Sequence, residues 1–271
     1  MTLFEKAKTR MKVWLAETPA PLQPSVRALL AVLSAVGVVK LEKYVYAKLG
    51  FPRAVLNGPL AGMAYLPISF GSALLPKITG TYEKELHPHL EKLKGECFDV
   101  LVDVGSAEGY YAIGLTRLLR PQATHCYDTN TDAHGALLKL AEINGVTTPL
   151  KMNGLCTPAN LEALLAGAKH PLVFVDCEGG EFSLLDPARV PALARSTLFV
   201  ETHYARVSGR HEPLEKRFES THQVEKVVML PRSPEDAPAG GKFSERERML
   251  MVDERRRDLE HWLVMTPRRR P

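Results

Sequence analysis

The sequence has few cysteines, no long apolar run and no strong excess of either charge. Only 4 of the 271 residues are cysteine, and none stands in a C-x-x-C pair or near a histidine at metal-ligand spacing. This argues against a disulfide scaffold and against a zinc site. The longest apolar stretch, residues 26–39, is shorter than the ~20 residues that cross a membrane. It also lies behind three prolines, too far from Met1 for a signal peptide.

Composition and charge indicate an ordinary globular protein. Hydrophobic residues make up 45% and charged residues 24% of the chain, which excludes a disordered or collagen-like protein. The net charge is +4, and the basic residues gather at the chain ends, notably at 255–257 and 268–270. A nucleic-acid enzyme needs a broad basic face, so we interpret these ends as solvated and expect no nucleic-acid partner.

Location and assembly follow from the same features. Three of the cysteines lie in apolar runs, so we expect reduced, buried thiols and a cytoplasmic protein. Two alternatives stay open for the N-terminal part. The basic start and the apolar 26–39 helix could lie on a membrane surface, or that helix could pair across a two-fold axis in a homodimer.

The chain changes texture near residue 80. Residues 1–80 predict helices over 3–15 and 25–48, then short strands and turns punctuated by glycine and proline, as in an accessory or lid segment. Residues 81–271 predict strands that alternate with helices. We expect strands at 98–104, up to about 128, 149–152, 172–176, 197–201, 223–230 and 261–266, and helices at 82–94, up to 119, 132–144, 158–166, after 176 and 213–220. Residues 245–257 fit either element, and 232–242 predict a loop. This alternation is typical of a doubly wound α/β sheet.

The first predicted strand is followed by a turn with two glycines. Gly105 permits a tight strand-to-helix turn, and Gly109 lets the helix pack closely while its first amides face a ligand. A dinucleotide site needs a further glycine where Ala107 stands, because the backbone must approach a pyrophosphate there. S-adenosylmethionine has no phosphate and tolerates the alanine. We therefore expect this cofactor, with its amino-acid part held near Asp103.

The next two strand ends carry further candidates for a nucleoside. Asp128 lies 23 residues beyond Gly105, the position that binds ribose hydroxyls in nucleotide sites of this topology. Its other interpretation is a helix cap. Asn153 and Gly154 follow the third strand and are placed to flank the edge of the base.

Acidic residues and a histidine gather after the fourth and fifth strands. Asp176, Glu178 and Glu181 stand within six residues, and His203 follows the next strand after Glu201. Charges at this density are costly in a core and useful for chemistry, although Glu178 and Glu181 could also complement a helix dipole.

These motifs together resemble the FkbM-like branch of class I S-adenosylmethionine-dependent methyltransferases. The resemblance is carried by residues 80–83 (Gly-Thr-Tyr-Glu), 103–111, Asp128 with Asn144, and 176–181 with Leu184 and Leu185. One departure is Asp128-Thr129, where that branch commonly has Glu-Pro. The resemblance implies a Rossmann-like sheet of seven strands, mostly parallel, with an antiparallel final hairpin. It also implies transfer of a methyl group, often to a hydroxyl.

The resemblance further implies roles for individual residues. Tyr82 and Glu83 would close over the cofactor, the segment from Asp103 through Gly105 and Ser106 to Gly109 would hold its methionine part, and Asp128 would hold its ribose. We expect O-methylation of a hydroxyl on a small-molecule, sugar or lipid-linked acceptor. The alternatives are an RNA or protein methyltransferase and a non-catalytic nucleoside-binding module.

The chemistry of such a transfer requires alignment and the removal of one proton. We expect His203 to be the base, with Asp176 as the alternative and Glu178 and Glu181 as further catalytic candidates. Asp176 also borders the expected cofactor site. A divalent metal ion at Asp176 would polarise the acceptor, but the spacing alone assigns no metal ligands.

Overall fold

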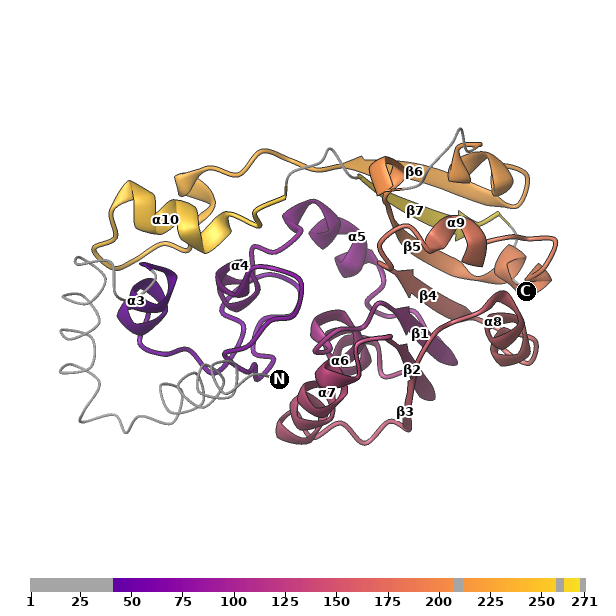
Figure 1. The fold of residues 1–271 in the computed structure, drawn as a ribbon, viewed down its shortest axis with the longest axis horizontal. Coiled ribbons are helices and arrows are strands. Elements are labelled where there is room, and N and C mark those ends of the chain that lie inside the picture. Colours follow the sequence, from indigo (N-terminus) through magenta and orange to yellow (C-terminus); the bar gives the residue numbers. More distant parts are fainter. Residues whose placement is uncertain (1–40, 207–211, 257–260, 269–271) are drawn as a thin grey trace. The chain divides into compact units, whose positions relative to one another are not determined.

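A computed structural model describes residues 41–206, 212–256 and 261–268, which form two compact units (Figure 1). The first unit contains residues 41–84 and 231–256, and the second contains 85–230 and 261–268. Residues 231–256, which we expect from the sequence alone to belong to the sheet domain, are part of the first unit. The predicted helix at 3–15, most of the helix at 25–48 and the apolar stretch 26–39 lie outside the described residues.

The second unit is built on a seven-stranded sheet. Its strands are β1 (Val100–Val104), β2 (Ala123–Tyr127), β3 (Leu150–Asn153), β4 (Pro171–Val175), β5 (Thr197–Thr202), β6 (His222–Val228) and β7 (His261–Pro267). The strand order is β3-β2-β1-β4-β5-β7-β6. Strands β1 to β5 are parallel, and β7 runs antiparallel to both β5 and β6. The predicted fold class, a mostly parallel Rossmann-like sheet of seven strands with an antiparallel last pair, is confirmed.

Both faces of this sheet are covered, because every residue of β1, β4 and β5 is buried. Side chains alternate between faces along a strand. Val100, Val102 and Val104 join a core with helices α8 (Pro158–Leu165) and α9 (Glu181–Leu184). Leu101 joins a second core with α5 (His87–Lys92) and α6 (Tyr110–Leu119). The continuous apolar strands of the sequence reflect this double burial.

Several predicted helices are shorter in the structure. The helix expected at 82–94 is a 3-10 turn (Lys84–Leu86) followed by α5, and the one expected at 213–220 is a 3-10 turn (Leu214–Arg217). Helix α7 (Thr131–Ile143) matches its prediction closely. The ambiguous segment 245–257 contains α10 (Glu245–Val252), which begins where Ser244 and Glu247 form a reciprocal capping box.

The first unit joins two segments that are far apart in sequence. It contains α3 (Leu41–Lys48), α4 (Leu74–Thr79), a 3-10 turn (Pro234–Asp236) and α10. Lys48 pairs with Glu247 at 2.8 Å, and the Thr79 hydroxyl donates to the Met251 carbonyl at 2.8 Å. The strands expected between 58 and 80 reduce to one bridge, Ala54 to Ala64, besides α4. Short glycine- and proline-rich pieces have too few residues to pair as strands.

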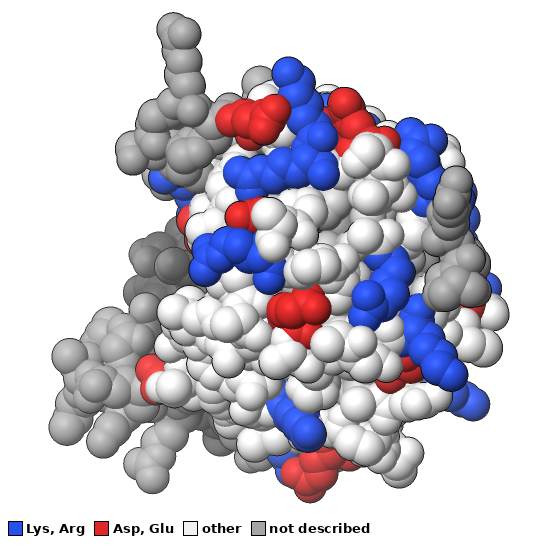
Figure 2. Space-filling model, turned by 90° about the vertical axis from the view of Figure 1, so that its right-hand side faces the viewer, with Lys and Arg blue, Asp and Glu red and all other residues white. Residues whose placement is uncertain are grey.

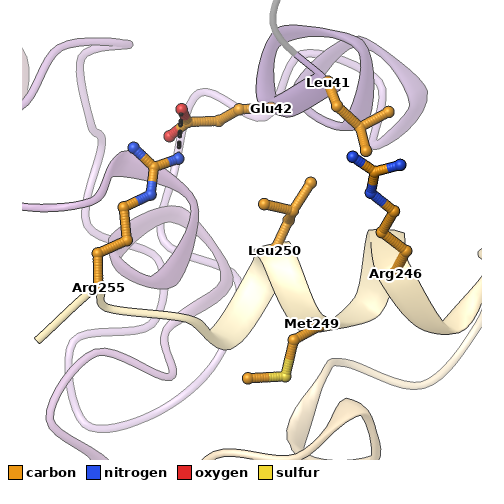
Figure 3. Close-up of a pocket in the computed structure, with 6 residues that line it drawn as sticks. All are labelled: Leu41, Glu42, Arg246, Met249, Leu250 and Arg255. Atoms are coloured by element: carbon orange, nitrogen blue, oxygen red, sulfur yellow. Dashed lines mark hydrogen bonds and ion pairs between the residues drawn. The ribbon is translucent and has the colours of Figure 1, made fainter.

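A pocket of about 270 Å³ lies between α3 and α10 in the first unit (Figure 3). It is lined by Leu41, Glu42, Arg246, Met249, Leu250 and Arg255, and Arg255 pairs with Glu42 at 2.9 Å. No site residue predicted from the sequence lines it. Among the described residues, no helix is long and apolar enough to cross a bilayer.

Candidate active site

The loop after β1 packs closely against the loop after β4. Gly105 has φ +89°, and a Cβ built there would lie 1.6 Å from the backbone oxygen of Asp176. The Gly105 amide donates to the Tyr127 carbonyl at 2.8 Å, and the Asp176 amide donates to the Val104 carbonyl at 2.9 Å. Only glycine fits here, because any side chain would force the two strand ends apart. The tight turn is as predicted, and its contact with a cofactor stays a prediction.

The same loop ends at Gly109, the N-cap of α6. Gly109 has φ +96°, and an added Cβ would lie 2.8 Å from the Leu137 side chain of α7. The glycine therefore permits close packing of two helices, as predicted. That the first amides of α6 face a ligand stays a prediction.

Asp128 ties this loop to the end of β2. Its Oδ2 accepts a hydrogen bond from the Ala107 amide at 2.7 Å, and its Oδ1 accepts one from the Asn130 amide at 2.7 Å. Ala107 adopts φ +43°, a left-handed conformation that costs a non-glycine residue about 1–2 kcal/mol. The hydrogen bond that the Ala107 amide donates to Asp128 helps to hold that conformation. Asp128 remains partly exposed, so its other lone pairs can still accept hydrogen bonds from a ligand.

The remaining cofactor candidates in this unit border the same strand ends. Asp103 is buried within β1, and Ser106 is buried with its amide donating to Tyr127 at 3.1 Å. The Asn153 side chain donates back to the Cys126 and Lys151 carbonyls, both at 3.3 Å. Asn153 therefore joins β3 to β2. Gly154 is exposed, with no atom within 4 Å of where its Cβ would stand.

His203 follows β5, and its imidazole lies among four carboxylates. Nε2 is 3.6 Å from Asp176 Oδ1 and 3.8 Å from both Glu178 Oε2 and Glu201 Oε2. The His203 side chain is 2% exposed, whereas those of Asp176 and Glu178 are 32% and 61% exposed. The structure thus brings together all the residues that the sequence marked for chemistry. The imidazole is thus buried, whereas solvent can reach the carboxylates of Asp176 and Glu178.

Glu181 is fully buried behind His203. Its Oε1 accepts the His203 amide at 2.7 Å and lies 3.3 Å from Nδ1, and its Oε2 accepts the Gly179 amide at 2.9 Å. Burial raises the pKa of Glu181, but the hydrogen bonds from His203 and the neighbouring amides outweigh this, so the pKa is lowered. The ionised carboxylate favours a proton on Nδ1, which leaves the Nε2 lone pair facing Asp176 and Glu178. Glu181 therefore orients the imidazole.

The loop after β4 is held in an uncommon conformation. Glu178 has φ +59° and Gly179 has φ +103°, and Glu178 forms an ion pair with Arg206. Strain of this kind is often found at functional sites. Cys177 in the same loop is not suited to nucleophilic chemistry. Its pKa is raised by burial, and further by the negative charges of Glu181 and Asp176, so the thiol stays protonated at neutral pH.

An aromatic group lies beside His203. The Tyr204 ring stacks on His261 at 5.8 Å and meets Phe182 edge-on at 4.9 Å, and its hydroxyl donates to Glu215 at 2.9 Å. Burial raises the pKa of Tyr204 to about 12 and lowers that of His261 to about 4. Both rings are therefore neutral near pH 7. They form an uncharged wall at this end of β5.

Tyr204 and Arg206 are not among the site residues predicted from the sequence. The one signal was spacing: Arg206 stands three residues after His203, and residues 204–206 form a 3-10 turn. Residues three apart in such a turn lie on the same side. The Arg206 side chain therefore lies on the same side of the turn as His203.

Tyr82 and Glu83 belong to the first unit. Tyr82 lies beneath the cations of Lys77 and Arg256, at 5.1 and 5.8 Å from its ring centre. Glu83 is fully buried and forms an ion pair with Arg256. These contacts bind residues 79–84 to the segment 231–256. Their closure over a cofactor stays a prediction.

The four cysteines are free thiols. Cys126 and Cys156 are buried free thiols, Cys177 is half-buried, and Cys97, between α5 and β1, is exposed. The expectation of buried thiols thus holds for Cys126 and Cys156. Figure 2 shows one face of the molecule, on which Lys and Arg side chains are interspersed with acidic and uncharged surface.

Comparison of the sequence with protein-family models and with curated proteins finds no match. Solved structures do match in shape. An rRNA methylase from Streptococcus thermophilus has a TM-score of 0.43 at 10% identity, over 68% of this chain and 96% of that one. Precorrin-6y C5,15-methyltransferase from Geobacter metallireducens has a TM-score of 0.41 at 13% identity, over 65% and 83%. M. jannaschii TYW2, in complex with AdoMet, has a TM-score of 0.42 at 15% identity, over 70% and 75%.

Proposed function

We propose that this protein is an S-adenosylmethionine-dependent methyltransferase of the FkbM-like kind, which methylates a hydroxyl of a small-molecule, sugar or lipid-linked acceptor. One observation carries the proposal. Asp128 holds the loop after β1 through the Ala107 amide while its carboxylate stays partly exposed at the end of β2. In open α/β sheets, ligands bind at the carboxyl ends of the strands, and an acid at this position binds ribose.

The loop itself supports this cofactor over a dinucleotide. Ala107 carries a Cβ at the point where a dinucleotide site needs bare backbone, and its amide already donates to Asp128. A nucleoside without a pyrophosphate does not require that approach. In this proposal Asp128 binds the ribose hydroxyls and the segment 103–109 binds the methionine part. Gly154 leaves open space beside the base.

When bound, S-adenosylmethionine supplies a methyl group already activated on a sulfonium ion. The protein must then align the acceptor and accept its proton. His203 is suited to this because Glu181 holds its Nδ1 side and Nε2 faces the exposed carboxylates. The proton would pass from the acceptor hydroxyl to Nε2, with Asp176 as the alternative acceptor. The neutral wall of Tyr204 and His261 would limit water at the transfer.

Thermal unfolding with S-adenosylhomocysteine, S-adenosylmethionine and NAD tests the cofactor. A ligand present at 100 times its dissociation constant adds about 2.7 kcal/mol of stability. We expect a shift with the first two ligands, lost in Asp128→Ala and kept in Asp132→Ala. Asp132 is a matched control, since it is an exposed aspartate in the same segment. Each shift is measured against the same variant without ligand. No shift with the first two, or a shift with NAD alone, contradicts the proposal.

Transfer is measured separately, with tritiated methyl donor and a cell extract as the source of acceptors. We expect tritium in extractable small molecules, reduced at least 100-fold in His203→Gln while the thermal shift with S-adenosylhomocysteine remains. Cofactor binding without any transfer would identify a nucleoside-binding module instead.

A further inference from the structure

The candidate active site brings together three possible metal-ligand atoms, one each from Asp176, Glu178 and His203. One oxygen from each carboxylate and one imidazole nitrogen all lie within 4.8 Å of one another. The group comes from two loops, since the two acids follow β4 and the histidine follows β5. It combines a buried imidazole with two carboxylates that solvent can reach, so an ion could enter.

The distances in this group fit ligands of a shared ion better than direct hydrogen bonds. Nε2 is 3.6 Å from Asp176 and 3.8 Å from Glu178, beyond the 2.7–3.2 Å of an N–H···O bond. Two neighbouring ligands at about 2.2 Å from one octahedral ion lie about 3.1 Å apart. Each carboxylate oxygen therefore needs to approach Nε2 by less than an ångström to share an ion with it. Glu178, the most exposed of the three, has the freedom to do so.

Glu181 supplies an independent indication. Histidines that bind metals almost always donate their other ring N–H to a carboxylate or carbonyl, which orients the ring and raises its basicity. Here Nδ1 faces the buried carboxylate of Glu181 at 3.3 Å, and the backbone amides of His203 and Gly179 hold that carboxylate in place. The arrangement leaves Nε2, with its lone pair, on the side of Asp176 and Glu178.

The negative charges around His203 also favour a bound cation. Four carboxylates, those of Asp176, Glu178, Glu181 and Glu201, surround one imidazole. Arg206 already pairs with Glu178 at the exposed rim. A cation at the centre would offset the repulsion among the acids, and it would compete with Arg206 for Glu178.

We propose that Asp176, Glu178 and His203 bind a divalent metal ion of the Mn²⁺ type. Two carboxylates and one imidazole suit a first-row divalent ion better than Ca²⁺, which prefers oxygen ligands alone. The binding of the ion does not depend on the proposed function, but its use in the reaction does. The ion would lower the pKa of a coordinated acceptor hydroxyl. With the ion on Nε2, His203 would serve as a ligand and not as the base, and the hydroxyl proton would pass to the alternative acceptor, an oxygen of Asp176 that is not bound to the ion.

Manganese binding to the full-length protein, measured by electron paramagnetic resonance, tests the site without any turnover. We expect one bound Mn²⁺ per chain, weakened at least 10-fold in Asp176→Asn and in Glu178→Gln. Glu219→Gln is the matched control, because Glu219 is exposed and lies outside the cluster. Both affected acids are partly exposed, so these variants should keep the native circular dichroism and melting temperature.

Arg206→Ala makes the test sharper, because it predicts a gain. Removing the competing cation should tighten Mn²⁺ binding roughly 3- to 10-fold. Equal binding in the wild type, Asp176→Asn and Glu178→Gln would overturn the proposal, as would no binding at millimolar Mn²⁺. The thermal shift with S-adenosylhomocysteine is recorded on the same samples. A normal shift without Mn²⁺ binding refutes the metal site alone, and Mn²⁺ binding without a shift refutes the cofactor alone.

Discussion

Gly105→Ala should be far more destabilising than Gly95→Ala, although the two glycines have nearly the same backbone conformation. Gly105 has φ +89° and Gly95 has φ +91°. Each substitution therefore costs about 1–2 kcal/mol for placing a Cβ in a left-handed conformation. A Cβ at Gly95 meets no atom within 4 Å, whereas one at Gly105 would lie 1.6 Å from the Asp176 carbonyl oxygen. The difference between the variants isolates the contact between the two loops.

The magnitude follows from the hydrogen bonds that must yield. To admit the Cβ, the ends of β1 and β4 must separate by more than an ångström, which strains the Gly105 to Tyr127 and Asp176 to Val104 bonds. Losing two such bonds costs about 2 kcal/mol in addition to the conformational cost. We expect Gly105→Ala to lower the free energy of unfolding by about 3–4 kcal/mol, and Gly95→Ala by about 1–2 kcal/mol.

Urea unfolding followed by tryptophan fluorescence measures this difference. The chain has two tryptophans, Trp14 and Trp262. A Trp14→Phe background leaves Trp262, which lies in the core of the sheet and reports the second unit. An equal loss of stability in the two glycine variants would refute the reasoning, because it would mean that the loops after β1 and β4 are not in contact.

Three further predictions concern buried groups. Burial lowers the pKa of His261 to about 4, below its unfolded value. The stability that comes from the neutral imidazole is therefore fully present above pH 6.5 and is lost as pH falls toward 4. His261→Phe should therefore remove about 2 kcal/mol of the wild-type loss of stability between pH 7 and pH 5 in urea titrations, and an unchanged pH profile would contradict this. With Ellman's reagent the native protein should show one fast thiol, that of exposed Cys97, which Cys97→Ser removes; fast reaction of Cys126 or Cys156 would show that the sheet is looser than described. Glu181→Gln should lower stability by about 3 kcal/mol and shift the nitrogen chemical shifts of the His203 ring toward the other tautomer, whereas an unchanged ring spectrum would refute its orienting role.

The sheet was predictable from the sequence because its strands are buried on both faces. Residues 171–175 are a continuous apolar run, and residues 100–104 are apolar except for Asp103, a pattern typical of strands buried on both faces. The antiparallel last hairpin came from the family resemblance alone. The position of β7 between β5 and β6 was not predicted, since no local pattern encodes strand order. The association of 231–256 with 41–84 was also beyond prediction. It depends on pairs such as Lys48 with Glu247, which lie 199 positions apart.

The candidate site was predictable as a set of strand ends, but not as an arrangement of side chains. Parallel strands bring Asp128, Asp176 and His203 to one edge of the sheet whatever their side chains do. Which acid lies behind the histidine and which lies in front depends on the turn at Glu178 and Gly179. That turn buries Glu181 and leaves Glu178 exposed. Sequence spacing alone treats these two glutamates as equivalent.

Hydrogen–deuterium exchange with and without S-adenosylhomocysteine locates a bound cofactor on the chain. We expect slower exchange in peptides that cover 103–109 and 127–130, where the amides of Ala107 and Asn130 donate to Asp128. Exchange that is unchanged in these two segments, or slowed only elsewhere in the chain, would contradict a cofactor site at the carboxyl ends of β1 and β2.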